Sequence, residues 1–307
     1  MGFSVTIVGS SGAVPAFGRH PSCQFVHVQN RCLLLDCGEG AQMQLSAYQL
    51  PVHKINHIFI SHLHGDHYLG LMGLLFTLHL QKRTADLHLY SPRGLEEIIV
   101  QQLKYANSAL HFNICHTPFR TDVAECILDD EAITVTTIPL RHKLPTAGFL
   151  IREKTKPLRI DKTRLVAGMK LQHIAQLKQG HDVVEDGHIL YRATDFTRPP
   201  KPSFAYAYCS DTAFAQEVMT QVADADLLYH EATFMEADRD KATETLHSTA
   251  RQAAEVAKGA RVKKLMIGHF SARYRELDGL LAEAKDIFPE TLLATEGLTI
   301  ELDSHDS

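Results

Sequence analysis

Short runs of apolar residues recur along the chain and indicate its secondary structure. Runs of about five residues rich in Val, Ile, Leu, Phe and Tyr are typical of β-strands, whereas apolar residues repeating every three or four positions indicate helices. Strands and helices are interspersed without regular alternation, which favours an α+β sandwich of sheets flanked by helices over a Rossmann sheet or a barrel. The predicted strands cover residues 4–8, 24–28, 32–36, 57–60, 87–90, 132–138, 148–151, 204–208, 227–229, 264–267 and 298–302, and the predicted helices cover 69–81, 95–104, 212–223, 249–258 and 277–287.

The composition is that of an ordinary globular protein. Of the 307 residues, 45% are hydrophobic and 22% are charged, and the chain is long enough for one large layered domain. The longest mostly apolar stretch, residues 69–80, is too short to cross a bilayer, and the start lacks the pattern of a secretory signal. We therefore expect a single domain over residues 1–307, no membrane association and a cytoplasmic location.

One segment differs from the rest in charge. The whole chain carries a formal charge of −5, yet residues 152–178 hold eight basic residues against two acidic ones. The stretch that follows is poor in strand signals and ends in RPPKPS, which favours an extended connector. We expect residues 152–203 to form a basic arm inserted into the main domain. The alternative is a solvated surface loop whose lysines bind nothing specific.

The sequence SHLHGDH, residues 61–67, places three histidines and an aspartate directly after a predicted strand. In an extended loop, residues two apart point the same way, so His62 and His64 can reach one cation while Asp66 and His67 turn toward a second. The spacing therefore predicts a pair of metal ions. The alternative is that these histidines cap a turn and hold no metal.

Three further residues are candidate ligands. His142, Asp211 and His269 each follow a predicted strand. Taken singly, each is as easily a hydrogen-bonded core or loop residue, but their common position at strand ends favours a shared site. With histidine nitrogens and carboxylate oxygens as the ligand set, zinc is the first choice, and manganese and iron stay open.

Several motifs together resemble those of a known family. HLHGDH is similar to the signature of the metallo-β-lactamase superfamily, and the accompanying motifs resemble those of the ribonuclease Z family, which processes the 3′ ends of tRNA precursors. The resemblance implies an αββα sandwich with an inserted protruding arm. The motifs are DCGEGAQ at residues 36–42, HLHGDH at 62–67, HEATF at 230–234, HST at 247–249 and HFSARY at 269–274.

The resemblance also implies a mechanism and a ligand set. Asp66 would orient or deprotonate the attacking water, and His247 would protonate the departing ribose 3′-oxygen, with Glu231 raising the pKa of His247 and fixing its tautomer. Read without the family, Ser248 is a plausible N-cap for a helix from residue 249, so local capping is the alternative for this stretch. The implied ligands of the two zinc ions per subunit are His62, His64 and His142 for one, Asp66, His67 and His269 for the other, and Asp211 as the bridge.

A macromolecular substrate follows from the same resemblance. Cleavage would release the 3′ trailer of precursor tRNA, leaving a 3′-hydroxyl on the tRNA and a 5′-phosphate on the trailer. The basic arm would grip the tRNA backbone, and in a homodimer one subunit's arm would lie beside the other's active site. The implied substrate-binding residues are Arg19, Ser271 and Arg273 near the site, and Lys154, Lys156, Lys170 and Lys178 in the arm.

Two stretches depart from the family pattern. The arm keeps Gly168, but no proline follows it where the family has a Gly-Pro pair and then a tyrosine. The loop PAFGRH, residues 15–20, keeps Arg19 but has Phe17 and His20 where the family often has a lysine and an asparagine. The arm tip and the treatment of CCA-containing ends are therefore not predicted by the resemblance.

Two other functions fit parts of the sequence. An enzyme of the same fold could hydrolyse small phosphodiesters, sulfate esters or thioesters, but such substrates have little need of a basic arm. A non-catalytic RNA-binding protein would need neither the full ligand set nor a general acid. Deletion of residues 152–203 would distinguish tRNA processing from small-substrate hydrolysis, because only the former depends on the arm.

Overall fold

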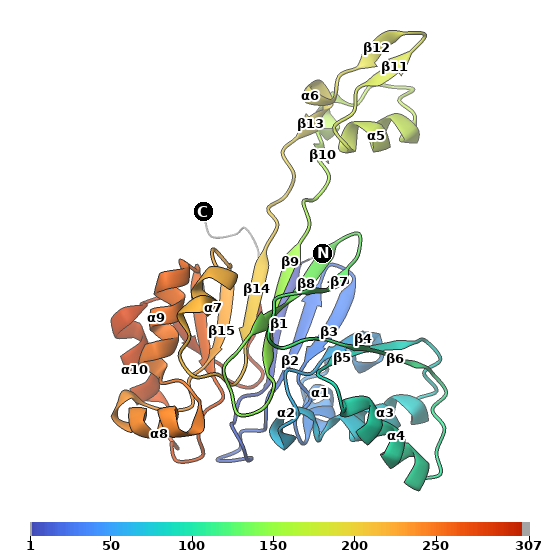
Figure 1. The fold of residues 1–307 in the computed structure, drawn as a ribbon. Coiled ribbons are helices and arrows are strands. Elements are labelled where there is room, and N and C mark those ends of the chain that lie inside the picture. The colour runs from blue at the N-terminus through green and yellow to red at the C-terminus, as the bar shows by residue number, and fades with distance from the viewer. Residues whose placement is uncertain (1, 303–307) are drawn as a thin grey trace.

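The computed structural model describes residues 2–302, in which two β-sheets face each other and helices cover the outer side of each (Figure 1). The layers are helix, sheet, sheet, helix. This is the αββα sandwich expected from the sequence. Among the described residues, none of the helices combines the length and apolar character that a membrane span requires.

The first sheet comes mainly from the N-terminal third of the chain. Helices α1 (Ala41–Ala47), α3 (Leu71–Leu80) and α4 (Leu95–Tyr105) cover its outer face, and their leucines and alanines form one apolar cluster with that face. Its strand order is β18 (Thr299–Glu301), β1 (Phe3–Gly9), β2 (Cys23–Val28), β3 (Arg31–Leu35), β4 (Ile55–Phe59), β5 (Leu87–Ser91) and β6 (Ile114–Pro118).

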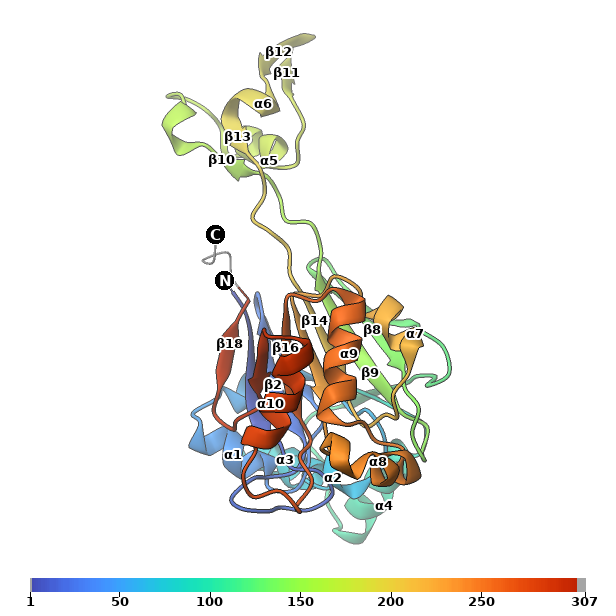
Figure 2. The ribbon, with the colours of Figure 1, turned by 90° about the vertical axis from the view of Figure 1, so that its left-hand side faces the viewer.

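The second sheet is built from the remaining chain. Helices α7 (Gln216–Gln221), α9 (Ala250–Ala260) and α10 (Asp278–Ile287) pack on its outer face, while α8 (Arg239–Thr245) lies toward one end of the sandwich (Figure 2). Its strand order is β17 (Thr291–Leu293), β16 (Lys264–Gly268), β15 (Leu227–Glu231), β14 (Ala205–Cys209), β9 (Ala147–Glu153), β8 (Ile133–Pro139) and β7 (Cys126–Asp129).

The alternation of residues along β14 shows why this sequence fits between two layers. Successive side chains of a strand point to opposite faces. Tyr206 and Tyr208 enter the core between the sheets, whereas Ala205, Ala207 and Cys209 face the helices. Small residues on the helix side let α7 and α9 approach closely, and bulky rings fill the space between the sheets.

The arm is a small folded unit that projects far from the sandwich (Figure 1). It leaves the body after Glu153, the last residue of β9, and returns at Ala205, the first residue of β14. Its buried residues Leu177, Val183 and Ala193 form a separate minor core. It contains β10 (Arg159–Ile160), α5 (Leu171–Lys178), β11 (Val183–Glu185), β12 (His188–Tyr191), α6 (Ala193–Phe196) and β13 (Thr197–Arg198).

One predicted helix is shorter than expected. Residues 212–223 were expected to be helical throughout, but α7 begins only at Gln216. The backbone N–H of Thr212 donates to Glu231 at 3.0 Å, and that of Ala213 donates to the carbonyl of Arg141 at 2.8 Å. These tertiary hydrogen bonds hold residues 212–215 in an extended loop beside the predicted site, so the helix starts later.

Candidate active site

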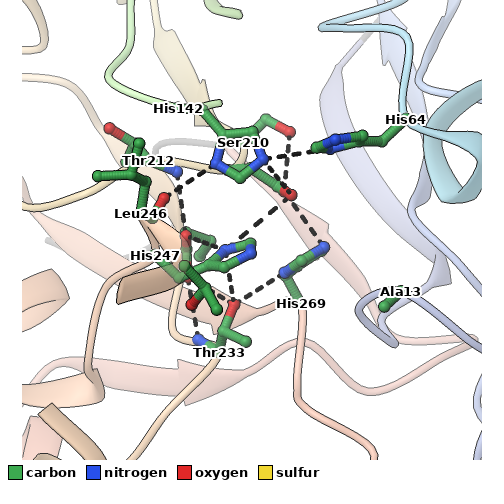
Figure 3. Close-up of polar contacts among 12 residues, drawn as sticks. Ala13, His64, His142, Ser210, Thr212, Thr233, Leu246, His247 and His269 are labelled. Atoms are coloured by element: carbon green, nitrogen blue, oxygen red, sulfur yellow. Dashed lines mark hydrogen bonds and ion pairs between the residues drawn. The ribbon is translucent and has the colours of Figure 1, made fainter. Parts of the chain in front are cut away.

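All seven predicted metal ligands lie together at one end of the sandwich, in segments that follow strands. His62 and His64 follow β4, and the short helix α2 (Gly65–Tyr68) carries Asp66 and His67. His142, Asp211 and His269 follow β8, β14 and β16. Figure 3 shows the rings of His64, His142 and His269 turned toward a common centre.

The first group of side chains consists of His62, His64, His142 and Asp211. Nδ1 of His64 lies 3.0 Å from Nε2 of His62 and 3.2 Å from Nε2 of His142. Oδ2 of Asp211 is 3.7 Å from Nε2 of His62 and 3.8 Å from Nε2 of His142. One atom from each residue therefore points at a shared point, and the four atoms lie within 4.8 Å of one another.

The second group shares Asp211 with the first. Its other oxygen, Oδ1, lies 3.3 Å from Nε2 of His67 and 3.2 Å from Nε2 of His269. Oδ2 of Asp66 lies 3.3 Å from the same two nitrogens. Asp211 thus presents one oxygen to each group, as a bridging carboxylate would.

Buried partners fix the orientation of His62 in the first group and of His67 in the second. Nδ1 of His67 donates to Oδ2 of Asp36 at 2.7 Å, and Nδ1 of His62 lies 3.0 Å from the hydroxyl of Ser61. The Ser61 hydroxyl in turn donates to Oδ2 of Asp36 at 2.9 Å. The phenol of Tyr208 donates to the same Asp36 oxygen at 2.6 Å. With Nδ1 occupied, each ring presents Nε2 to the centre, which is how metal-binding histidines are usually held.

His142 and His269 are oriented in the same way. Nδ1 of His142 donates to the carbonyl of Leu246 at 2.9 Å. Nδ1 of His269 lies 2.8 Å from Oγ1 of Thr233, and this hydroxyl donates to Oε2 of Glu231 at 2.7 Å. In both rings Nε2 is left for the centre (Figure 3).

The electrostatics of the cluster fit bound cations. Burial lowers the pKa of His62, His64 and His142, so these rings are neutral near pH 7 and each keeps a lone pair. Burial opposes charge on His67 as well, but Asp211, Asp66 and Asp36 outweigh it and raise the pKa of that ring. The negative charge of these three carboxylates therefore favours a cation between the two groups of ligands.

Nε2 of His67 provides a direct test of fit. This ring has no exposed surface, and among residues 2–302 its Nε2 finds no hydrogen-bond partner. A buried polar atom without a partner is costly. A metal ion at the centre would satisfy this nitrogen, so the residues present fit the metals that the sequence implies.

His247 lies beside the metal groups but is held differently. Its ring is 5.3 Å from that of His269 and 4.9 Å from that of His142. Its Nδ1 donates to Oε1 of the buried Glu231 at 2.7 Å. Burial lowers the pKa of His247, but the charge and hydrogen bond of Glu231 outweigh it and raise the pKa to about 9. The structure therefore pairs a proton-carrying imidazole with a carboxylate next to the cluster.

The alternative prediction, that Ser248 is the N-cap of the following helix, is wrong. Helix α9 begins at Ala250, and its N-cap is Thr249, whose side chain accepts from the backbone of Gln252 in a capping box. Ser248 instead donates its hydroxyl to the carbonyl of Thr212 at 2.7 Å. This bond ties the His247 segment to the loop that follows Asp211.

A cavity of about 400 Å³ opens onto both metal groups and His247. Glu39 and Lys143 line it, although neither was expected at the site. The backbone N–H of Ala13 donates to Oδ2 of Asp66 at 2.8 Å and so limits the orientations of that carboxylate. The cavity is wide enough for a phosphodiester and its neighbouring groups.

Three supporting residues were not identified from the sequence, namely Asp36, Ser61 and Thr233. Asp36 belongs to the DCGEGAQ motif, but no role followed from that motif alone. The one signal in the sequence is that Asp36 directly follows an apolar run, as the other site residues do. The structure adds that its backbone has φ 55°, an unusual conformation for a residue other than glycine. Ser61 and Thr233 carry no comparable local signal.

The substrate-binding residues predicted near the site are partly engaged in internal contacts. The guanidinium of Arg19 donates to the carbonyls of Tyr274 and Arg275, at 2.6 and 3.2 Å. Nη1 of Arg273 donates to Oδ1 of Asp238 at 3.2 Å. The backbone N–H of Ser271 donates to the carbonyl of Thr233 at 3.3 Å. These residues lie in the segment between His269 and α10, or against it.

The four predicted lysines differ in their surroundings. Lys154 pairs with Asp129 of β7, and Lys156 donates to Glu153 at 2.7 Å and to the carbonyl of Pro202 at 2.8 Å, so both lie at the root of the arm. Lys170 lies 3.5 Å from Glu185 within the arm, and Lys178 is exposed at the end of α5.

The fold and the histidine and aspartate cluster define a hydrolase of the metallo-β-lactamase fold. The metallo-β-lactamase fold protein YhfI from Bacillus subtilis superposes with a TM-score of 0.68 and 21% identity, over 98% of this chain and all of that one. The family model described as "Anti-Pycsar protein Apyc1" matches residues 3–156, half of the chain.

Relatives of higher sequence identity show which family of this fold the chain belongs to. "Ribonuclease Z" of Bacteroides fragilis is 44% identical over 301 residues, covering 98% of this chain and 99% of that protein. The short form of human tRNase Z superposes with a TM-score of 0.71 and 28% identity, over 97% of this chain and 98% of that one. The chain belongs to the ribonuclease Z family over nearly its full length, and its N-terminal half also belongs to the Apyc1 family. It is a metal-dependent hydrolase of the endoribonuclease type.

Proposed function

We propose that this chain is a two-zinc endoribonuclease that removes 3′ trailers from precursor tRNA. The observation that carries the proposal is the convergence of seven ligand residues, in two groups sharing Asp211, beside a His247–Glu231 pair. Full-length similarity to proteins named ribonuclease Z supports the choice of RNA over small substrates. A cytoplasmic location stays a prediction.

The ligands would divide as the sequence implies. Neutral imidazoles and carboxylates around a compact centre suit zinc. When bound, the two ions would make water nucleophilic at neutral pH and stabilise the charge that builds on the phosphodiester oxygens. One ion would be held by His62, His64 and His142, the other by Asp66, His67 and His269, with Asp211 between them.

The residues of the chain itself supply positioning and proton transfer. Asp66, held by the N–H of Ala13, would orient the attacking water and accept its proton. His247 would donate a proton to the ribose 3′-oxygen as it leaves, since that alkoxide is a poor leaving group. Glu231 would keep His247 protonated and correctly turned. The products would be a tRNA with a 3′-hydroxyl and a trailer with a 5′-phosphate.

The arm would bind the folded part of the tRNA. A tRNA is far larger than the cavity, so contacts outside the cavity are needed. The arm projects from the body (Figure 2), and several of its basic residues are exposed. Such contacts would be made mainly to phosphates and would weaken steeply with salt. We further propose a homodimer in which each arm serves the partner's active site.

The cleavage itself is tested with a precursor tRNA that carries a 3′ trailer. Purified protein, with and without chelator, is incubated with this RNA and the new ends are mapped. We expect one cut at the 3′ side of the tRNA, a 3′-hydroxyl on the upstream product, and no cut with chelator. Cleavage that persists after complete removal of metal would contradict the proposal.

The arm is tested by deletion. The backbone N–H of Glu153 donates to the carbonyl of Phe204 at 2.9 Å, so a short turn can join β9 directly to β14. We expect this variant to lose precursor cleavage while still hydrolysing bis(p-nitrophenyl) phosphate. Unchanged cleavage of precursor tRNA would contradict the proposed role of the arm.

A further inference from the structure

The loop between β1 and β2 ends in a tight turn with an aromatic residue at its tip. The N–H of Ala16 and the carbonyl of Arg19 bond at 3.1 Å, and the N–H of Arg19 and the carbonyl of Ala16 at 2.9 Å. The two residues between them, Phe17 and Gly18, have φ of 54° and 78°. This is the geometry of a two-residue hairpin turn, in which glycine, asparagine and aspartate are the preferred residues.

A phenylalanine at position 17 therefore destabilises the turn relative to the preferred residues. A bulky residue with positive φ is sterically strained, and the Phe17 side chain is 54% exposed, so it contributes little to the core. Neither the turn nor the packing of the sandwich calls for an aromatic residue at this position.

Two arginines lie next to the Phe17 ring. The guanidinium carbon of Arg19 lies 5.3 Å from the centre of the Phe17 ring, and that of Arg275 lies 5.9 Å from it. The Arg275 side chain is 78% exposed, and its Nε lies 3.9 Å from Oε1 of the similarly exposed Glu276, a solvent-screened pair that leaves the guanidinium accessible. An open aromatic surface next to exposed positive charge is the combination that binds single-stranded nucleic acid, the ring stacking on a base and the charge meeting the phosphates.

The turn also lies beside the active site. Ala13 and Pro21, on either side of it, line the cavity. The bonds from Arg19 to the carbonyls of Tyr274 and Arg275 tie the turn to the segment that begins at His269. Figures 1 and 2 both place this loop at the end of the sandwich that carries the site.

We propose that Phe17 is a stacking platform for an unpaired base of the RNA next to the cleaved phosphodiester. The inference rests on the proposed function and adds a positioning residue to it. Stacking accepts any base, so the platform would hold the flexible 3′ segment in place without reading its sequence.

The first test separates binding from chemistry. We expect Phe17→Leu, which keeps an apolar side chain but removes the ring, to raise KM for precursor tRNA about tenfold with kcat retained, and Phe17→Trp to restore the wild-type KM. Tyr105→Leu, which removes an aromatic side chain that is 85% exposed on α4, is the matched control and should change neither constant. Wild-type KM in Phe17→Leu would overturn the proposal.

A spectroscopic test reports stacking itself. A short single-stranded RNA carrying 2-aminopurine loses fluorescence when that base stacks on an aromatic ring. We expect quenching on binding to the wild-type protein and to Phe17→Trp, and none with Phe17→Leu. Equal quenching by wild type and Phe17→Leu would refute the platform. If the wild-type protein leaves precursor tRNA uncut, the proposed function fails, and this measurement still decides whether Phe17 stacks on a base.

Discussion

Nδ1 of His247 donates a hydrogen bond to Oε1 of Glu231 at 2.7 Å, and the Glu231 side chain has no exposed surface. Glu231 also accepts from the N–H groups of Thr212 and Thr233, both at 3.0 Å. Through the hydroxyl of Thr233 the same carboxylate is linked to His269. One buried charge thus connects the proposed general acid to a proposed metal ligand.

Replacing His247 by Ala should remove turnover and leave the metals in place. Nδ1 of His142 and Nδ1 of His269 bond to Leu246 and Thr233 and not to His247, so the ligands should stay in place. We expect kcat for precursor tRNA to fall by about 10²- to 10⁴-fold, the usual contribution of a general acid. Steady-state kinetics and elemental analysis check this, with exposed His53→Ala as the control. A zinc content that fell with activity would assign His247 to metal binding instead.

Glu231→Gln should reduce both turnover and stability. Glutamine lacks the negative charge that favours protonated His247. Its NH2 group would also face N–H and O–H donors whose hydrogen bonds Glu231 now accepts, and those donors would lose their acceptor. We expect a lower kcat, and a free energy of unfolding lower by about 1–3 kcal/mol. Urea denaturation and kinetics measure the two effects, with the exposed Glu217→Gln for comparison. Stability and kcat both equal to wild type would show that the charge has no role.

Asp36→Asn should weaken metal binding without touching a ligand. Asp36 receives hydrogen bonds from His67, Ser61 and Tyr208, and an amide cannot accept them all. The loss should lower zinc affinity about 10- to 100-fold, as is usual when the partner of a ligating histidine is removed. Competition with a fluorescent chelator measures the affinity. Exposed Asp122→Asn should bind zinc like wild type, and an Asp36→Asn affinity that matches it would contradict the prediction.

Two lysines of the arm should respond differently to removal. Lys178 is exposed on α5, so Lys178→Ala should weaken precursor binding and reduce the slope of log affinity against log salt by about one. Lys156 is already paired with Glu153 and Pro202, so Lys156→Ala should leave that slope unchanged and lower stability instead. Filter binding over a salt series and thermal melting distinguish the two. Identical salt slopes for wild type and Lys178→Ala would remove Lys178 from the interface.

The central strands of the two sheets were predictable because their apolar runs are buried, whereas the more exposed β6 and β7 carry no such run and were missed. The segment 204–208 is an example: its tyrosines enter the core and its alanines face helices, so every position is apolar or aromatic. The start of α7 was not predictable in the same way. Thr212 and Ala213 are held by bonds to Glu231 and Arg141, which are distant in sequence, and local helical periodicity carries no information about such contacts.

The same distinction applies to the site. The ligands of the SHLHGDH loop are close in sequence, and their spacing alone indicates metal binding. Thr233 and Ser61 each act through one hydroxyl group that joins a neighbouring residue to a distant one, His269 and Asp36 respectively. The distant partner is unknown before the chain is folded, so neither residue is distinguishable from an ordinary surface threonine or serine. For Lys156 the sequence predicts an RNA contact. The structure adds that its ammonium group is hydrogen-bonded to Glu153 and to the carbonyl of Pro202, which no local pattern indicates.

The place where the arm joins the body has an evolutionary consequence. β9 and β14 are adjacent antiparallel strands, with Arg152 opposite Ala205 and Phe149 opposite Tyr208, and their far ends lead to His142 and Asp211. The arm is in effect the loop of a hairpin whose stem is already complete. Segments of other size or charge can be exchanged there while the catalytic end stays as it is, so under the proposed role of the arm a single insertion event would add or remove the binding of a large substrate.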